Sequence, residues 1–170
     1  MTTFYFIVWI AVLTATAIYF TIKYHYRLKP KEFRPVIHLE YWNTDSILLL
    51  GMINDYRAFN DLVRLIPEEL NHTMADVRCT TVISNFFIEG RELSHKGFPD
   101  IAGMMLKEGI IGMGENLAYG YDKNILAFRH FTESESHNEN MLNPKWKYIG
   151  IDIRIDPTIK RKFYVVIFSY

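Results

Sequence analysis

The 170-residue sequence has one cysteine, no excess of charge of either sign, and no charged residue among its first 22 positions. Because Cys79 is alone, no disulfide can form within the chain, which leaves the redox compartment open. Lysine plus arginine and aspartate plus glutamate each number 19, so the basic excess of nucleic-acid-binding proteins is missing. We therefore expect a protein that does not bind nucleic acid.

The uncharged segment, residues 1–22, would form a helix of about 33 Å, enough to cross a hydrocarbon core of about 30 Å. A cleaved signal peptide is the alternative, with residues 4–13 as its apolar core and residues 15–17 as its small-residue site. No lysine or arginine precedes that core. This absence favours a retained transmembrane helix that contacts the lipid bilayer.

Basic residues follow this segment at Lys23, Arg27, Lys29 and Lys31, whereas none precedes it. The positive-inside bias then places the rest of the chain on the cytoplasmic face, or on the equivalent face of a virion or organelle. Residues 23–44 mix charges, aromatic residues and two prolines without a period, which indicates a juxtamembrane linker. We expect a single-pass membrane protein.

Residues 45–170 show the pattern of one α+β domain. Apolar residues at three-to-four spacing predict a helix over about residues 45–66, with Thr44 or Asp45 as its N-cap. Further helices are expected over residues 67–90, residues 99–109 and a segment that Asp122 caps. The core-facing residues predicted for the first two helices are Leu49, Met52, Ile53, Tyr56, Phe59, Val63, Leu70, Met74, Val77, Val82, Ile83, Phe86 and Phe87.

The period changes near the C-terminus. Isoleucines occupy every second position from Ile149 to Ile155, which is the repeat of a half-buried strand. Residues 163–168 form an apolar run of strand length, and residues 156–161 between the two runs indicate a hairpin loop. Helices first and strands last predict helices packed on a small antiparallel sheet.

Three short segments place ionisable groups beside turn-forming residues. They are Ser94-His95, the block Gly-Glu-Asn-Leu-Ala over residues 114–118, and Ser-x-x-His-x-x-Asn-Met-Leu-Asn-Pro over residues 134–144. An Ile-Asn-Asp-Tyr-Arg helix lies upstream at residues 53–57, and the Tyr148 strand lies downstream. In order and spacing these motifs resemble the CAP superfamily, named for cysteine-rich secretory proteins, antigen 5 and plant pathogenesis-related proteins. The short bacterial branch without disulfides is the most similar.

The resemblance covers roughly residues 46–168 and implies an α-β-α sandwich with an open cleft. Two histidines and, in many relatives, two acidic residues line that cleft. In this sequence the matching positions are His95, Glu115 and His137. Relatives usually carry tryptophan six residues before the last histidine, where this chain has Phe131, a change that keeps an aromatic residue in the core.

The position of the second acid holds Ser134, so Glu133 or Glu135 would have to replace it. Ser134 also stands where the N-cap of a short helix is expected. Asn116 is expected to satisfy buried backbone groups, or alternatively to orient Glu115.

Two imidazoles and one or two carboxylates that converge can hold a divalent transition metal, with zinc the first to test on His95, Glu115 and His137. The same groups can act as general acid and base through a bridging water. They can also simply fix the geometry of residues 114–118 by hydrogen bonds. We expect a membrane-anchored CAP-like binding module with a cleft for a metal ion or small ligand.

Two other functions stay open. One is a hydrolase that uses the same cleft, so the sequence does not decide whether the protein is an enzyme. The other is a structural subunit of a larger membrane assembly, such as a virion membrane layer or an organellar complex, with other protein chains as partners.

Several further residues have simpler explanations. Cys79 is expected to be a small core residue rather than a nucleophile, because no Cys-His signature surrounds it. His72 and His130 are expected on exposed helix faces. Asn71-His72-Thr73 matches the glycosylation acceptor pattern but falls within a predicted helix.

Overall fold

The computed structural model describes Leu39 and residues 42–170 of the chain. The predicted transmembrane helix over residues 1–22 and nearly all of the predicted linker over residues 23–44 lie outside the described residues. Among the helices that are described, none has the length and apolar character needed to cross a membrane.

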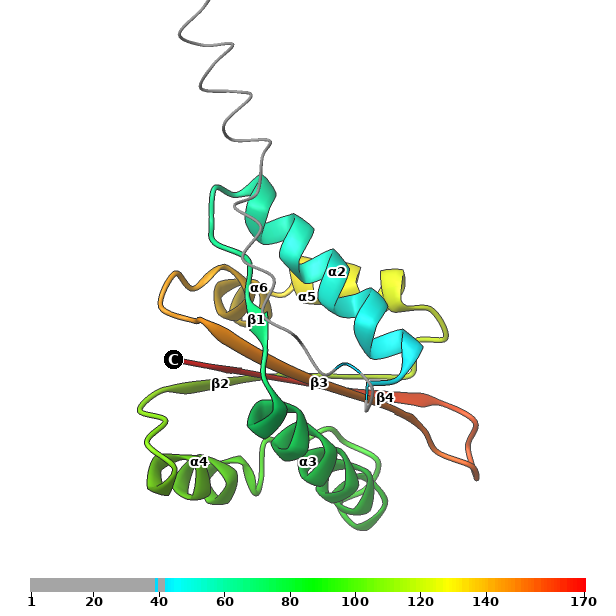
Figure 1. Ribbon diagram of the computed structural model, residues 1–170. Helices are drawn as coiled ribbons and strands as arrows, with labels where there is room; N and C mark the ends of the chain where they lie inside the picture. The colour runs from blue at the N-terminus through cyan, green and yellow to red at the C-terminus, as the bar shows by residue number, and fades with distance from the viewer. Residues whose placement is uncertain (1–38, 40–41) are drawn as a thin grey trace, which may run out of the picture. The chain divides into compact units, whose positions relative to one another are not determined.

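The described domain is an α-β-α sandwich (Figure 1). Helices α3 and α4 cover one face of a central sheet, and α2, α5 and α6 cover the other. This confirms the predicted α+β class and layering. The elements in chain order are α2 (Thr44–Phe59), β1 (Ile66–Pro67), α3 (Glu69–Ile88), α4 (Phe98–Lys107), β2 (Met113–Tyr119), α5 (Asn124–Glu133), α6 (Glu135–Leu142), β3 (Tyr148–Ile155) and β4 (Lys162–Ser169).

The sheet has the strand order β1-β3-β4-β2. β3 and β4 form the predicted antiparallel hairpin, and β2 pairs antiparallel with β4 as an edge strand. The short strand β1 runs parallel to β3, so the prediction of a purely antiparallel sheet is wrong in this detail. Pro67 belongs to β1 rather than to a helix, and α3 begins only after Glu68, whose carboxylate accepts a hydrogen bond from the Asn71 backbone at 2.8 Å.

Strand β2 is a second element that the sequence pattern does not predict. It contains the Gly-Glu-Asn-Leu-Ala block, whose glycine and polar residues lower the propensity for a strand. Its side chains alternate between the two layers, because Leu117 joins the core cluster under α3 and Ala118 joins the cluster under α2 and α5. By this alternation Glu115 faces α3 and Asn116 faces α6.

The helix cores follow the predicted stripes only in part. Leu49, Ile53, Val82 and Phe86 are buried, and so is Cys79, which confirms its role as a small core residue. Phe59 and Val63, by contrast, are 86% and 83% exposed. The first helix ends at Phe59 instead of continuing to residue 66, since Asp61 adopts a left-handed φ of 61° that breaks the helix. Val77 and Phe87 are also exposed, contrary to the prediction.

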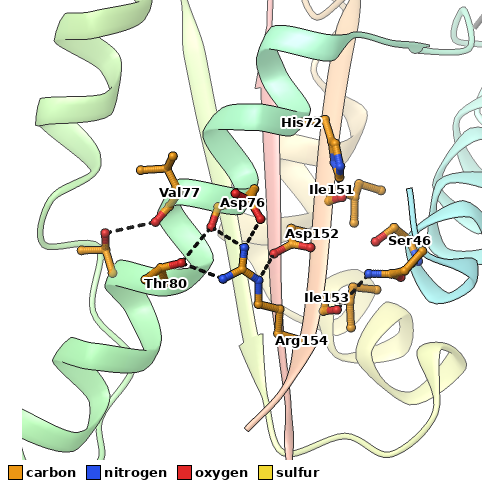
Figure 2. Close-up of polar contacts among 11 residues, drawn as sticks. Ser46, His72, Asp76, Val77, Thr80, Ile151, Asp152, Ile153 and Arg154 are labelled. Carbon is orange, nitrogen blue, oxygen red and sulfur yellow. Dashed lines mark hydrogen bonds and ion pairs between the residues drawn. The ribbon is translucent and has the colours of Figure 1, made fainter. Parts of the chain in front are cut away.

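Side chains cover the open part of the β3 edge beyond the short β1. His72 donates from Nδ1 to the Ile151 carbonyl at 2.9 Å, as Figure 2 shows, and stacks on Trp42 with ring centroids 4.8 Å apart. His72 is therefore partly buried rather than exposed as predicted. Farther along the edge, Asn43 Nδ2 donates to the Ile153 carbonyl at 3.0 Å. Such capping blocks the pairing of further strands at this edge.

A charged network lies beside this edge (Figure 2). Arg154 pairs with the carboxylate of Asp152 at 2.7 Å, with the carboxylate of Asp76, and with the Thr80 hydroxyl at 2.6 Å. Burial raises the pKa of Asp152, and the positive charge of Arg154 opposes that rise. The network joins α3 to β3 and so stabilises the packing of this helix on the sheet.

Candidate functional site

The carboxylate of Glu115 lies in a fully buried ion pair. Arg78 on α3 donates from Nε to Oε1 at 2.7 Å and from Nη2 to Oε2 at 3.3 Å, and the two side chains are 0% and 1% exposed. The same Nη2 donates to the Ser94 carbonyl at 2.9 Å, which ties the loop after α3 to this pair. A buried ion pair of this geometry is expensive to break, because the remaining charge would have no partner.

The imidazole of His95 rests on this ion pair from the solvent side. Its Nδ1 lies 2.7 Å from Oε2 of Glu115, yet the side chain is 59% exposed. A carboxylate that already binds an arginine accepts the hydrogen bond, so Nδ1 is the protonated nitrogen of the neutral ring. Nε2 is then left with a free lone pair on an exposed ring.

His137 approaches the same sheet edge from the opposite helical layer. It lies on α6, is half-buried, and meets Phe131 edge-on with ring centroids 5.2 Å apart. Burial lowers the pKa of His137, and the charges of His130 and His95 lower it further. The ring centroid of His130 lies 5.4 Å from that of His137.

Two asparagines attach α6 to the edge strand. Asn116 donates from Nδ2 to the His137 carbonyl at 2.9 Å, which is the backbone role expected for it. Asn140 donates from Nδ2 to the Asn116 side-chain oxygen at 2.9 Å and to the Glu115 carbonyl at 3.2 Å. A Cβ on Gly114 would lie 2.8 Å from Oδ1 of Asn140, so the glycine permits this close approach.

Helix α2 holds the far end of α6. Arg57, fully buried, donates from Nη1 to the carbonyls of Met141 at 2.7 Å and Asn143 at 3.0 Å. Tyr56 donates from its hydroxyl to the Asn138 side chain at 3.0 Å. The Ile-Asn-Asp-Tyr-Arg motif thus fixes the helix that carries His137.

The structure brings His95 and Glu115 into contact, and it ties His137 to the same strand through the hydrogen bond from Asn116 to its backbone carbonyl. It does not bring the other predicted acids there. Glu133 is exposed and pairs with Arg129 on its own helix at 2.7 Å. Glu135 is exposed in the first turn of α6. Ser134 is the N-cap residue of α6 as expected, although its side chain makes no capping hydrogen bond.

The side chains predicted to bind zinc are arranged unfavourably for a metal ion. Within residues 39 and 42–170, no group of three or more His, Cys, Asp or Glu side chains is arranged to hold a metal ion. Both oxygens of Glu115 already bind Arg78 and His95, so a metal would have to displace one of them. Zinc on His95, Glu115 and His137 remains an untested prediction that this geometry does not favour.

Two hollows in the described domain lie apart from the histidine pair. One of about 280 Å³ has Ala102, Leu106 and Met113 in its lining, and one of about 330 Å³ is lined by α3 residues that include His72. His95, Glu115 and His137 line neither of them.

Sequence reasoning missed Arg78 and His130. Arg78 lies in the buried stripe of α3 with Ala75, Cys79 and Val82 at three-to-four spacing, and a charge in such a stripe signals a buried counter-charge. His130 was predicted to be exposed but is partly buried against His137, and no sequence signal distinguishes it.

The comparisons with known proteins rest on solved structures, since neither a family model nor a curated protein matches the chain. An outer surface protein of Borrelia burgdorferi matches with TM-score 0.63 and 20% identity, over 78% of this chain and 95% of that one. A cysteine-rich secretory protein of Staphylococcus aureus matches with TM-score 0.59 and 19% identity, over 82% of this chain. An extracellular protein of Bacillus anthracis that contains an SCP domain matches with TM-score 0.61 and 19% identity, over 74% of this chain.

The chain covers only 40% of the Staphylococcus and Bacillus proteins. At these identities the likeness concerns the fold. The CAP resemblance predicted from the motifs is confirmed at that level, and the domain has a CAP-like fold.

Proposed function

We propose that this CAP-like domain is a binding module whose ligand contacts the imidazoles of His95 and His137 at the free edge of β2. These two imidazoles, with the Arg78–Glu115 ion pair beneath that of His95, are called the imidazole site below. The ligand we propose is a small polar organic molecule.

One observation carries the proposal: a carboxylate that is 1% exposed holds Nδ1 of an imidazole that is 59% exposed. A buried second group that orients an exposed ring is the arrangement by which proteins fix a histidine for binding or proton transfer. A histidine serving only the fold would have no need to keep its other nitrogen facing outward. His137 supplies the second ring from α6, a helix that Asn116 and Arg57 hold through the backbone carbonyls of His137 and Met141.

A small polar ligand fits this arrangement better than a metal ion does. Glu115 already has a full set of partners, whereas a metal site needs free lone pairs from at least three protein groups in the usual catalytic geometry. A neutral polar molecule requires no charge from the protein and can use Nε2 of His95 directly.

We further propose that the domain works outside the cell or at its surface, held to a membrane by residues 1–22. The three similar structures are those of an outer surface protein, a secretory protein and an extracellular protein. This setting is opposite to the cytoplasmic face that the basic residues after the segment predict. Protease protection of the full chain in intact cells distinguishes them, since only an outward domain is digested.

Ligand-observed magnetic resonance tests the binding proposal. Saturation transfer from the full chain to a library of small amides, alcohols and sugars should detect binders whose signal is lost in His95→Ala and in His137→Ala. His25→Ala, outside the described domain, is the matched control and should keep every signal. If the same compounds bind both variants and wild type equally, the imidazole site is not the binding site.

A hydrolase is the second candidate, and one observation favours it. The carboxylate of Glu115 binds Nδ1 of His95, which is how a carboxylate orients a histidine that acts as a general base through Nε2. Hydrolysis of peptides or peptidoglycan that is abolished by His95→Ala would support this function. An inert wild-type protein on both panels would count against it. The structural-subunit alternative concerns residues that lie mostly outside the described ones and stays a prediction.

A further inference from the structure

We infer that one end of the described domain rests on the surface of an anionic lipid bilayer. At this end the hairpin between β3 and β4 turns, and α2 and α5 begin (Figure 1). The inference rests on one part of the proposed function, the attachment of the domain to a membrane by residues 1–22. It goes further because it names the surface of the domain that contacts the lipid.

Hydrogen bonds and ion pairs hold these three elements together. Asn124, the first residue of α5, donates from Nδ2 to the carbonyl of Asp45 in the first turn of α2 at 2.7 Å. The carboxylate of Asp45 pairs with Nζ of Lys162 at 2.7 Å. Lys162 is the first residue of β4 and lies opposite Ile155, the last residue of β3. The residues next to these contacts therefore belong to one region of the surface.

Apolar side chains are exposed in this region. Five of them, each within three residues of a contact named above, are between 38% and 57% exposed: Ile47, Leu48, Ile125, Leu126 and Ile155. The first four lie in the first two turns of α2 and α5, where the Cα–Cβ bonds tilt toward the helix N-terminus and so toward this end of the domain. Single exposed apolar residues are ordinary, but a group of them beside charged residues is typical of a contact surface. These five residues, with Lys123 and Lys160, are called the hairpin-end surface below.

The charges at this end favour an anionic partner. Asp122 pairs with Arg161 at 3.2 Å, and Asp156 of the hairpin is buried, where its carboxylate accepts two backbone N–H groups. Lys123 and Lys160, by contrast, are exposed, and no carboxylate of the described domain pairs with either of them. Lysines beside apolar side chains, together with two helix N-termini that carry partial positive charge, attract anionic lipid head groups.

The path of the chain favours a bilayer over a protein partner. α2 begins at Thr44, and the preceding Asn43 bonds to the carbonyl of Ile153, so the chain enters the described domain beside the hairpin-end surface. Residues 23–43 reach at most about 75 Å even when fully extended, so a domain held by residues 1–22 stays near its membrane. Such attachment raises the effective concentration of the surface at the bilayer, and a weak contact is then enough.

Methyl resonances of the full chain measure this contact without any substitution. The chain, with ¹³C-labelled isoleucine methyl groups, is placed in nanodiscs of phosphatidylcholine and phosphatidylglycerol that carry a gadolinium chelate on a lipid head group. The signals of Ile47, Ile125 and Ile155 should broaden. Ile111 is the matched control, because it is 71% exposed and lies just before β2 at the opposite end of the sheet, and its signal should stay sharp.

Two double variants test the two components of the surface. Ile125→Gln with Leu126→Gln removes apolar area from exposed positions and should reduce the broadening of Ile47. Lys123→Gln with Lys160→Gln should reduce it to the level found in nanodiscs without phosphatidylglycerol, since each lysine near an anionic surface strengthens binding by about fivefold.

The matched control for the lysines is Lys145→Gln with Lys147→Gln, which removes two exposed lysines at the opposite end of the sheet and should change nothing. Equal reduction by both lysine pairs would overturn the charge component of the inference.

The remaining outcomes separate the surface from the anchor. If the chain enters the nanodiscs but Ile111 broadens as much as the other three methyl groups, or if none of them broadens, the inference fails and the anchor stands. Broadening in detergent that grows with protein concentration would place a second copy of the chain on the hairpin-end surface and would also overturn the inference. A chain that elutes apart from the nanodiscs would overturn both the anchor and the inference.

Discussion

Replacing Arg78 by methionine is the sharpest perturbation that the structure offers. Methionine has a similar reach along α3 but no charge, so Arg78→Met removes both hydrogen bonds to the carboxylate of Glu115. That carboxylate is 1% exposed and keeps only His95 as a partner. Loss of one member of a buried ion pair is among the most costly single changes, because the other charge stays buried.

The expected loss is about 3–5 kcal/mol in the free energy of unfolding. For chains of 150–250 residues each kcal/mol lowers the melting temperature by about 2–4 °C, so Arg78→Met should lower it by about 6–20 °C. Adding Glu115→Leu removes the stranded carboxylate and should restore much of the loss, because apolar residues can replace a buried pair at little net cost. His95 then loses its partner, but it is mostly exposed and contributes little to this balance.

Thermal melts of the full chain followed by circular dichroism give both values. Arg129→Met is the matched control, since it breaks an exposed arginine–glutamate pair on α5 and should leave the melting temperature almost unchanged. If Arg78→Met melts together with wild type, or if the double variant is less stable than both single variants, Arg78 and Glu115 do not form the buried pair described here.

Three further predictions concern the rest of the domain. Gly150→Ala should prevent folding or lower the free energy of unfolding by several kcal/mol, because the added Cβ would lie 2.1 Å from the backbone of Asn71. Gly51→Ala is the control, since Gly51 has open space around it and the variant should fold normally. Soluble yield and circular dichroism compare the two variants. Cys79 is buried, and burial raises the pKa of its thiol. A disulfide reagent should therefore label Cys79 only after the chain is unfolded in guanidinium. Rapid labelling of the native chain would contradict its burial. Asn71 is fully buried and bonded to Ser169, so expression in a glycosylating host should add no glycan there by mass spectrometry, and a glycan would show that this helix end is open.

The sequence predicts the strands and helices whose hydrophobic residues recur at a regular spacing. The isoleucine alternation from Ile149 gives β3, and the apolar run over residues 163–168 gives β4. The alternation predicts a half-buried strand, whereas residues 149–153 of β3 are buried on both faces because helices cover both sides of the sheet. Helix ends were less accurate. The stripe past Phe59 continues in the sequence, yet the left-handed conformation of Asp61 stops the helix, and periodicity does not report a single backbone angle.

The candidate site, too, is only partly predictable from the sequence. Family motifs are enough to single out His95, Glu115 and His137, but they do not show what Glu115 does. Its burial in β2 depends on Arg78, which is distant in sequence and belongs to no quoted motif. A polar residue in a strand is stable when a specific partner compensates it, and such partners become visible only once the helices and the sheet are assembled.

A crystal structure of the full chain tests the central claim most directly. The account predicts that Nδ1 of His95 hydrogen-bonds to buried Glu115 and that the imidazoles of His95 and His137 face one common site. A structure in which these two rings face separate parts of the surface would contradict it.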